Sequence, residues 1–268
     1  MSLSREQMLV EMGISPIWKL RETVQAAEPE ELPAEVPIET APAVDTRPSP
    51  PLVEKPALQT PASPPAVAPQ AANAAVDAMN WPELTRAVAE CRACPLCQQR
   101  KQAVLGVGDL NPDWLFIGEG PGADEDVQGE PFVGQAGKLL DNMLAALNIA
   151  RGNKVYIGNA VKCRPPGNRT PEAAEMAACR PYLERQIALL KPKIIVLLGK
   201  AAVHSLLHDD KALGALRGKR FEYAGIPVVV TYHPAYLLRN LPEKAKAWED
   251  LLFARRLLRD QAVPDLPF

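Results

Sequence analysis

Three side chains able to do chemistry follow three apolar runs of the sequence. Glu119 comes directly after the run 114–118, Asn159 after the run 154–158, and His233 shortly after a run that ends at residue 231. A carboxylate can handle a proton, an amide offers a donor and an acceptor to a nucleobase edge, and an imidazole can stabilise a developing anion. The carboxyl ends of parallel strands meet at one edge of a sheet. If the runs are parallel strands, these side chains converge on one pocket.

A glycine-rich turn lies beside the first of these groups. The segment Gly118–Gly122 joins an apolar run to a helical pattern, and glycines let the backbone approach a ligand closely. Glu125 lies among three consecutive acidic residues just behind it and is a second candidate for handling a proton, a metal or a cation. Phe132, in the following loop, offers a flat face on which a base can stack. The simpler alternative is a tight turn with solvated acids.

Five cysteines suggest a metal centre. Cys91 and Cys94 form a C-x2-C pair, Cys97 follows, and Cys163 and Cys179 lie far downstream. A C-x2-C turn places two thiolates on one metal, and remote thiolates can close the site around zinc or an iron–sulfur cluster. Ligation by cysteine alone, with no nearby His, slightly favours iron–sulfur. Two alternatives stay open: Cys94-x2-Cys97 is a rival pair, and the cysteines can be unrelated buried residues.

The composition is typical of a globular domain. Charged residues make up 23% and hydrophobic residues 47% of the 268 residues, and the net charge is -2. A contact with nucleic acid must therefore come from a local patch. The loop basic residues available for phosphates are Lys162, Arg164, Arg169, Arg217, Lys219, Arg220 and Arg239.

The sequence offers neither a membrane span nor a secretion signal. No apolar run approaches the roughly 20 residues that a membrane helix needs, and acidic residues interrupt the apolar positions near the N-terminus. We therefore expect no membrane contact and a cytoplasmic monomer. Cysteines in that compartment are not read as disulfides.

Apolar strands alternate with helical patterns from residue 76 onward. This alternation predicts an α/β fold, a three-layer α/β/α sandwich around a central, mainly parallel sheet. The expected strands cover 114–117, 154–158 and 193–199, with a hairpin at 221–231. The expected helices cover 77–90, 134–147, 170–190, 200–207 and 242–258, with Thr170 as the cap of the third.

Three segments differ in composition. Residues 1–25 form a short amphipathic, Trp18-bearing peptide, which we expect to bind a partner through that Trp. An arm packed on its own domain is the alternative. Residues 26–75 form a Pro/Ala-rich tract without helical or strand periodicity, which predicts a disordered linker. Residues 76–268 form the folded domain.

Residues from about 76 to 260 resemble the family 4 uracil-DNA glycosylases, the iron–sulfur-bearing branch. Six motifs carry the resemblance, and they match in order. They are Cys91-x2-Cys94-Pro-Leu, Gly118-Glu-Gly-Pro-Gly with Glu125-Asp126, Gly129-x-Pro-Phe132-Val-Gly, Asn159-Ala-Val-Lys-Cys163-Arg-Pro-Pro-Gly-Asn168-Arg, Cys179-Arg-Pro-Tyr-Leu, and His233-Pro-Ala-Tyr-Leu-Leu-Arg239.

The resemblance implies a uracil pocket. Glu119 and Gly120 would line it, Phe132 would stack on the flipped base, Asn159 would read its Watson–Crick edge, and His233 would face O2 of the leaving uracil. The implied reaction is hydrolysis of the N-glycosidic bond of deoxyuridine in single- or double-stranded DNA.

The resemblance also assigns a cofactor and a DNA-wedging loop. The four implied ligands of a [4Fe-4S] cluster are Cys91, Cys94, Cys163 and Cys179, which leaves Cys97 spare. The loop 236–239 would wedge into the minor groove, with Leu237 and Arg239 contacting the DNA.

Two details of the sequence bear on mechanism. Other branches of the superfamily carry an Asp where this chain has Gly120, so Glu119 and Glu125 become the candidates for handling the water. A related branch forms a covalent bond to the abasic sugar through a His in an inserted basic loop. The segment 163–170 contains no His, so ordinary turnover by a monofunctional glycosylase is expected.

The N-terminal peptide resembles a replication protein. Met12-Gly13-Ile14-Ser15 followed by Trp18-x-Leu20-Arg21 is similar to the N-terminus of the psi subunit of bacterial DNA polymerase III, which implies binding to the chi subunit of the clamp loader. An alternative function is therefore a psi-like, clamp-loader-associated subunit with a weak or inactive glycosylase domain. An iron–sulfur redox sensor is a further alternative.

Overall fold

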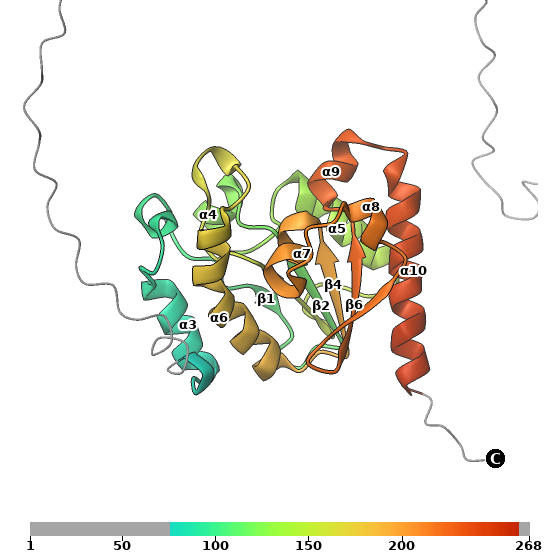
Figure 1. The fold of residues 1–268 in the computed structure, drawn as a ribbon, viewed down its shortest axis with the longest axis horizontal. Coiled ribbons are helices and arrows are strands. Elements are labelled where there is room, and N and C mark those ends of the chain that lie inside the picture. The colour runs from blue at the N-terminus through green and yellow to red at the C-terminus, as the bar shows by residue number, and fades with distance from the viewer. Residues whose placement is uncertain (1–75, 263–268) are drawn as a thin grey trace, which may run out of the picture. The chain divides into compact units, whose positions relative to one another are not determined.

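The computed structural model describes residues 76–262 (Figure 1). These residues lie within one compact unit. The predictions for the peptide 1–25 and for the linker 26–75 lie outside the described residues, as do residues 263–268.

One six-stranded sheet organises the described chain. Its order is β1-β3-β2-β4-β6-β5. The four inner strands are parallel and the two edge strands are antiparallel to their neighbours. The strands are β1 (Val107–Gly108), β2 (Trp114–Gly118), β3 (Val155–Asn159), β4 (Ile194–Leu198), β5 (Arg220–Tyr223) and β6 (Ile226–Thr231).

Helices follow most of the strands. The helices are α3 (Trp81–Glu90), α4 (Ala123–Gln128), α5 (Gln135–Ala146), α6 (Ala173–Leu190), α7 (Lys200–Leu207), α8 (Leu213–Leu216), α9 (Pro234–Arg239) and α10 (Glu243–Ala262). Two short 3-10 turns, η1 (Pro95–Gln98) and η2 (Pro166–Asn168), lie in the connections. No helix among residues 76–262 combines the length and the apolar character needed to cross a membrane.

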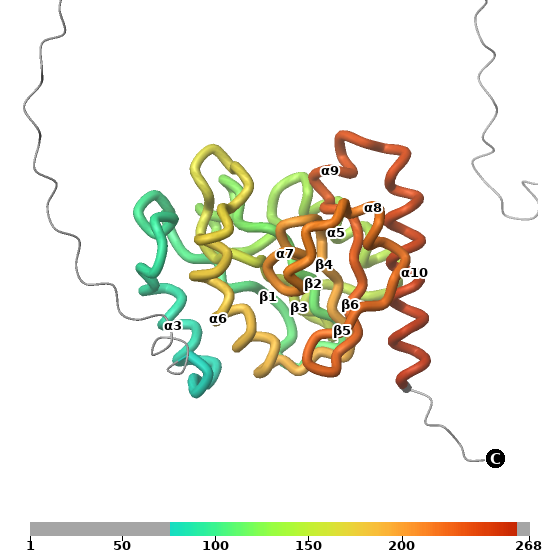
Figure 2. The backbone as a smooth tube through the Cα atoms, in the orientation of Figure 1, coloured from blue at the N-terminus to red at the C-terminus, as the bar shows by residue number. Residues whose placement is uncertain are grey.

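The inner strands are apolar because both faces of the sheet are covered. Every residue of β2, β3 and β4 is buried, whereas the edge strand β5 alternates between exposed and half-buried positions. One apolar cluster joins the sheet to α5 and α10, and a second joins its other face to α6 and α7. The helices on the two sides of the strands are visible in Figures 1 and 2. The predicted α/β/α sandwich with a mainly parallel sheet is confirmed.

Three local predictions need correction. The helix expected from residue 170 begins at Ala173, and its cap is Glu172, which forms a capping box with Glu175. Thr170 is therefore not a cap. The first helix begins at Trp81 rather than residue 77, since Asn80 forms its capping box. The segment 236–239 is not a loop but the end of helix α9.

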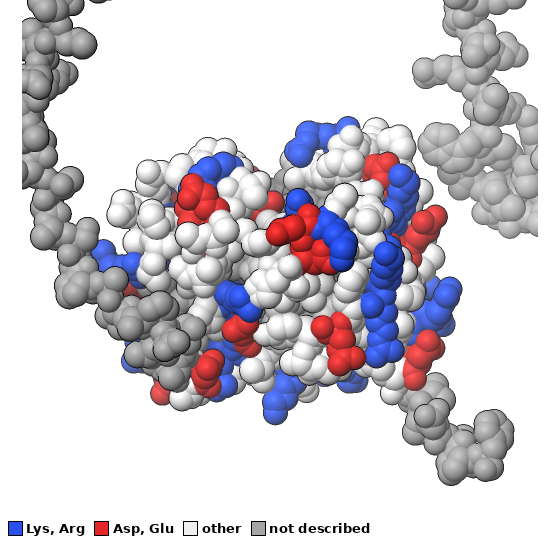
Figure 3. All heavy atoms as spheres, viewed as in Figure 1, with Lys and Arg blue, Asp and Glu red and all other residues white. Residues whose placement is uncertain are grey.

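Charges of both signs are interspersed on the visible face of the molecule (Figure 3). This mixed pattern agrees with the net charge of -2. A polyanion would therefore be held by particular basic side chains rather than by a field of one sign.

Candidate active site

A cavity of about 670 Å³ lies where the inner strands end. Since β2, β3, β4 and β6 are parallel, their carboxyl ends point toward the same edge, close to α9 in Figure 1. The cavity is lined by residues that follow each of the four strands: Glu119, Gly120, Phe132, Asn159, Gly199, His233 and Arg239 are among them. The chemistry-bearing side chains expected to converge thus do line one cavity.

Asn159 is the last residue of β3 and is almost completely buried, with 2% of its surface exposed. Its side-chain Oδ1 has no hydrogen-bond partner. A buried acceptor left without a partner has an energetic cost, so the site is complete only when a donor arrives. Gly118 makes room for this amide, because a Cβ at Gly118 would lie 2.5 Å from both Asn159 Oδ1 and Phe132 Cζ.

Phe132 is held in an unusual conformation at the wall of the cavity. Its φ is 56°, in the left-handed region that residues with side chains seldom adopt. Arg151 donates hydrogen bonds to the carbonyls of Pro131 and Phe132 at 2.8 and 2.9 Å, and a Cβ at Gly137 would lie 1.7 Å from the Phe132 oxygen. The Phe132 ring stacks beside His233, with ring centroids 5.4 Å apart. Arg151 and Gly137 carry no local sequence pattern that would predict this role.

His233 is a neutral donor fixed in one tautomer. It caps helix α9, and its Nδ1 accepts the backbone N–H of Ala235 at 3.1 Å. The ring proton therefore sits on Nε2, which is free to donate elsewhere. Burial lowers the pKa of His233 to about 4, and the positive charge of Arg239 acts in the same direction. A neutral imidazole that donates through Nε2 suits an anion forming in the cavity.

Glu119 forms a hydrogen bond with Thr170, the residue that was expected to cap a helix. Burial raises the pKa of Glu119, and a hydrogen bond with the Thr170 side chain opposes that effect. Thr170 was expected to cap a helix, but it lines the cavity. At the neighbouring position a Cβ on Gly120 would lie 2.7 Å from Val161 Cγ2. The backbone here has no room for an Asp unless Val161 moves.

Glu125 lines the cavity, but its carboxylate is already engaged. One oxygen accepts the N–H of Gly122 at 3.0 Å, and the other accepts the N–H groups of Val133 and Gly134 at 3.1 and 3.3 Å. These three hydrogen bonds fasten the start of α4 to the loop that carries Phe132. Glu125 therefore positions this loop, and its predicted catalytic role stays a prediction.

The predicted contact of Leu237 with DNA is wrong, because helix α9 buries this residue. Leu237 is 1% exposed and packs inside the domain, so it cannot enter DNA, whereas Leu238 is 41% exposed. The helical turn of α9 places neighbouring residues on different faces, which explains why one leucine is buried and the next is not. Tyr236 is also exposed and stacks on Tyr232, with centroids 5.0 Å apart. Arg239 lines the cavity, and its predicted contact with DNA stays a prediction.

The seven loop basic residues differ in their exposure. Lys162 is buried and Arg217 forms an ion pair with the buried Asp250 at 2.6 Å, so neither is free to hold a phosphate. Arg164 is half-buried and donates to Asn168 at 2.7 Å, and Arg169 is exposed but forms an ion pair with Glu175 at 2.7 Å. Lys219, Arg220 and Arg239 are exposed.

Four of the five cysteines surround one small cavity. Its lining includes Cys91, Cys94, Cys163 and Cys179, but not Cys97. No group of three or more His, Cys, Asp or Glu side chains in residues 76–262 is arranged to hold a metal ion. The cavity nevertheless gathers four cysteines from separate segments of the chain.

Two hydrogen-bond donors, one guanidinium and one backbone N–H, approach the cysteine sulfurs. Arg100 donates to Cys163 Sγ at 2.8 Å, and the backbone N–H of Lys162 donates to Cys179 Sγ at 3.3 Å. Burial raises the pKa of the Cys179 thiol to about 12, and the charge of Lys162 opposes this. Donors aimed at sulfur are the surroundings that an anionic thiolate cluster requires.

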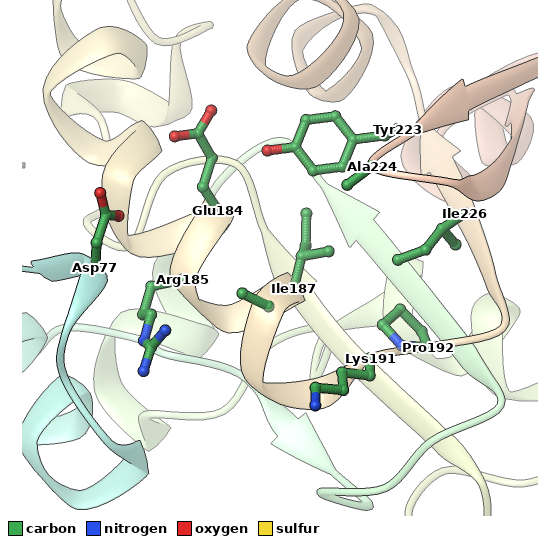
Figure 4. A pocket seen from close by; sticks show the side chains of 10 residues that line it. Asp77, Glu184, Arg185, Ile187, Lys191, Pro192, Tyr223, Ala224 and Ile226 are labelled. Atoms are coloured by element: carbon green, nitrogen blue, oxygen red, sulfur yellow. The ribbon is translucent and has the colours of Figure 1, made fainter.

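A second cavity, of about 610 Å³, lies at the opposite end of the sheet (Figure 4). It is bounded by the end of α6 and the β5–β6 hairpin, with Glu184 facing Tyr223 across it. Its other walls are apolar or carry the charges of Asp77, Arg185 and Lys191. Its lining contains neither an imidazole nor an unpartnered amide, whereas that of the first cavity contains both.

The fold and the cavity define a class of protein that comparison with known sequences identifies. Residues 105–252 match the family described as the uracil DNA glycosylase superfamily. The chain is 42% identical over 181 residues to a type-4 uracil-DNA glycosylase of Pyrobaculum aerophilum, covering 65% of this chain and 92% of that protein. It is 42% identical over 178 residues to the Thermotoga maritima type-4 enzyme, with the same coverage, and 40% identical over 184 residues to that of Saccharolobus solfataricus, covering 66% and 85%. The chain belongs to the type-4 uracil-DNA glycosylase family.

Proposed function

We propose that this chain hydrolyses the N-glycosidic bond of deoxyuridine in DNA, releasing uracil and leaving an abasic site. The observation that carries the proposal is the buried Oδ1 of Asn159, which has no hydrogen-bond partner. It lies in a cavity that is also lined by the Phe132 ring and by His233, which can donate a hydrogen bond. Uracil supplies what this site lacks, since its N3–H is a donor and its O2 and O4 are acceptors. Membership of the type-4 family supports the same substrate.

In the proposed mechanism the base leaves as an anion. Phe132 stacks on the flipped uracil, Asn159 Oδ1 accepts its N3–H, and His233 donates from Nε2 to O2. As the glycosidic bond breaks, negative charge collects on O2, where the His233 donor stabilises it. Because the pKa of His233 is about 4, the imidazole reaches the transition state neutral and acts by donation, without transferring its proton.

The sugar carbon becomes cationic and then takes up water. Phosphates of the DNA and the Glu119 carboxylate favour that cation, and Glu119 is the remaining candidate for orienting the water, since Glu125 is engaged elsewhere. The segment 163–170 offers no His for covalent capture of the sugar. We infer a monofunctional enzyme that turns over.

The exposed end of α9 is the proposed contact with the DNA gap. Leu238 and Tyr236 are exposed beside the cavity mouth and can fill the space that the flipped nucleotide leaves. Arg239 lies next to them and can hold a phosphate.

We infer that Cys91, Cys94, Cys163 and Cys179 hold a [4Fe-4S] cluster. The shared cavity and the donors from Arg100 and Lys162 support this ligand set, and Cys97 stays outside it. When bound, such a cluster would cross-link the 91–97 segment to the start of α6, which fixes the loop that carries Arg164 and Thr170 beside the active site. This role is structural.

Excision assays test the proposed function. Single- and double-stranded oligonucleotides with one deoxyuridine are incubated with the full chain, alongside matched oligonucleotides containing thymine or cytosine. We expect uracil release and alkali-labile sites from the deoxyuridine strands alone. Absence of excision by the iron-loaded protein on both substrates would refute the proposal and would favour the inactive, clamp-loader-associated alternative.

The N-terminal peptide 1–25 is a proposed tether to the replication machinery. Its resemblance to the psi subunit supports binding to the chi subunit, with Trp18 as the anchor. Binding of chi to the full chain, to a chain lacking residues 1–25 and to Trp18→Ala tests this. We expect binding by the full chain alone. Equal binding by all three would remove the tether from the proposal while leaving the glycosylase function intact.

A further inference from the structure

Lys162 is a buried lysine that the proposed mechanism does not use. Its side chain is 1% exposed, and its Nζ donates to the backbone carbonyl of Asn159 at 2.7 Å. Its own backbone N–H donates to Cys179 Sγ at 3.3 Å. One residue thus contacts the amide-bearing residue of the active site on one side and the cysteine set on the other.

The hydrogen bond from Lys162 to Asn159 does not depend on an ion pair. Within residues 76–262, none of the ion pairs formed by a carboxylate includes Lys162. An amine group can donate to a carbonyl in its neutral form and in its protonated form alike, so the 2.7 Å contact with the Asn159 carbonyl is available in either form.

The same ammonium group fixes the peptide that carries Asn159. Asn159 pairs with Gly118 at the end of the β2–β3 ladder, and the N–H groups of Ala160 and Val161 continue that ladder to the carbonyls of Gly118 and Glu119. Lys162 Nζ donates to the Asn159 carbonyl at this end of the ladder. Without that donor the carbonyl would be a buried, unpaired acceptor at the residue whose side chain must be placed most accurately.

We propose that Lys162 is a positioning residue that holds Asn159 in register for the uracil edge. The proposal rests on the proposed function, in which Asn159 reads the base. Lys162 touches neither substrate nor reacting atoms. Its contribution is to bind one backbone carbonyl, so its loss should weaken recognition of uracil and leave general DNA binding untouched.

Lys162→Met tests this, with Lys138→Met as the matched control because Lys138 is exposed on α5. Excision kinetics, binding of free uracil by calorimetry, binding of uracil-free duplex and iron content are measured. We expect Lys162→Met to lose roughly 10- to 100-fold in kcat/KM and a comparable factor in uracil affinity, as for an orphaned buried acceptor. Binding of uracil-free duplex should stay unchanged, and the control should match wild type.

A double-mutant cycle separates positioning from general damage. In an Asn159→Ala background, Lys162→Met should cost less than about twofold further in kcat/KM, because the residue it positions is gone. If Lys162→Met does not fold, Lys162→Gln replaces it, because Gln keeps a donor on a side chain that is one bond shorter. The kcat/KM of Lys162→Gln should then lie below that of wild type and above that expected for Lys162→Met. Wild-type kcat/KM and uracil affinity in Lys162→Met, or losses that multiply in the double variant, would overturn the proposal. An inactive wild type would instead refute the glycosylase function.

Discussion

Replacing His233 by alanine is expected to slow uracil excision on the order of a hundredfold or more. Removal of one donor from an oxyanion site costs about 2.7–4 kcal/mol, which corresponds to roughly a hundredfold to a thousandfold in rate. We expect the whole of this range to apply, because the ring proton is already on Nε2 before the substrate binds. The Ala235 N–H donates to Nδ1 and so fixes this tautomer. Single-turnover excision measures the chemical step directly. A wild-type rate in His233→Ala would refute the assignment.

The pH profile tests the same residue independently. A pKa of about 4, against an ordinary 6.5, keeps His233 neutral throughout pH 5–8, so it should contribute no change in rate there. Burial raises the pKa of Glu119, so an acid limb of the rate profile should belong to Glu119 and should disappear in Glu119→Gln. An acid limb near pH 6.5 that survives in Glu119→Gln but vanishes in His233→Asn would contradict the neutral imidazole.

The lowered pKa of His233 also makes the stability of the folded domain depend on pH. Between about pH 4 and pH 6.5 the unfolded chain binds a proton at His233 that the folded chain does not, so His233 should make the folded domain less stable as the pH falls through this window. Thermal unfolding of wild type and His233→Ala at pH 7.5 and pH 4.5 measures this. The two proteins should differ in their pH dependence, with wild type losing more stability in acid. Parallel losses in both would remove the predicted linkage.

Three further outcomes are expected. Leu237→Ala should lower the free energy of unfolding by about 2–5 kcal/mol in chemical denaturation. Leu238→Ala should leave the stability unchanged and should lower excision from double-stranded substrate more than from single-stranded substrate. A stable Leu237→Ala with the larger loss on double-stranded substrate would restore Leu237 as the wedge. Arg151→Ala should lower kcat/KM about tenfold by releasing the Phe132 carbonyl, and Arg151→Lys should recover part of the loss. Equal kcat/KM in wild type and both variants would exclude a role of Arg151 in holding Phe132. Cys97→Ser should keep its iron and visible absorbance; iron loss there would make Cys97 a ligand.

The sequence alone determined the sheet and the identity of the pocket's main groups. Continuous apolar runs such as 114–118 and 194–198 are legible because a parallel strand covered on both faces tolerates no polar residue. Once the runs are strands, right-handed crossovers bring their carboxyl ends to one edge. The order of Glu119, Asn159 and His233 along the chain therefore suffices to predict that they share one pocket.

Only the tertiary structure decided what each of these groups does. Glu125 resembles Glu119 in sequence, yet three backbone N–H groups occupy its carboxylate. Leu237 and Leu238 are identical neighbours, and the turn of α9 buries one and exposes the other.

Lys162 likewise reads as a loop cation and proves to be buried between Asn159 and the cysteines. In each case the deciding contact joins segments that no local periodicity relates. Residue type and spacing indicate what a side chain can do, but its free lone pairs and its exposure are fixed by the packing around it.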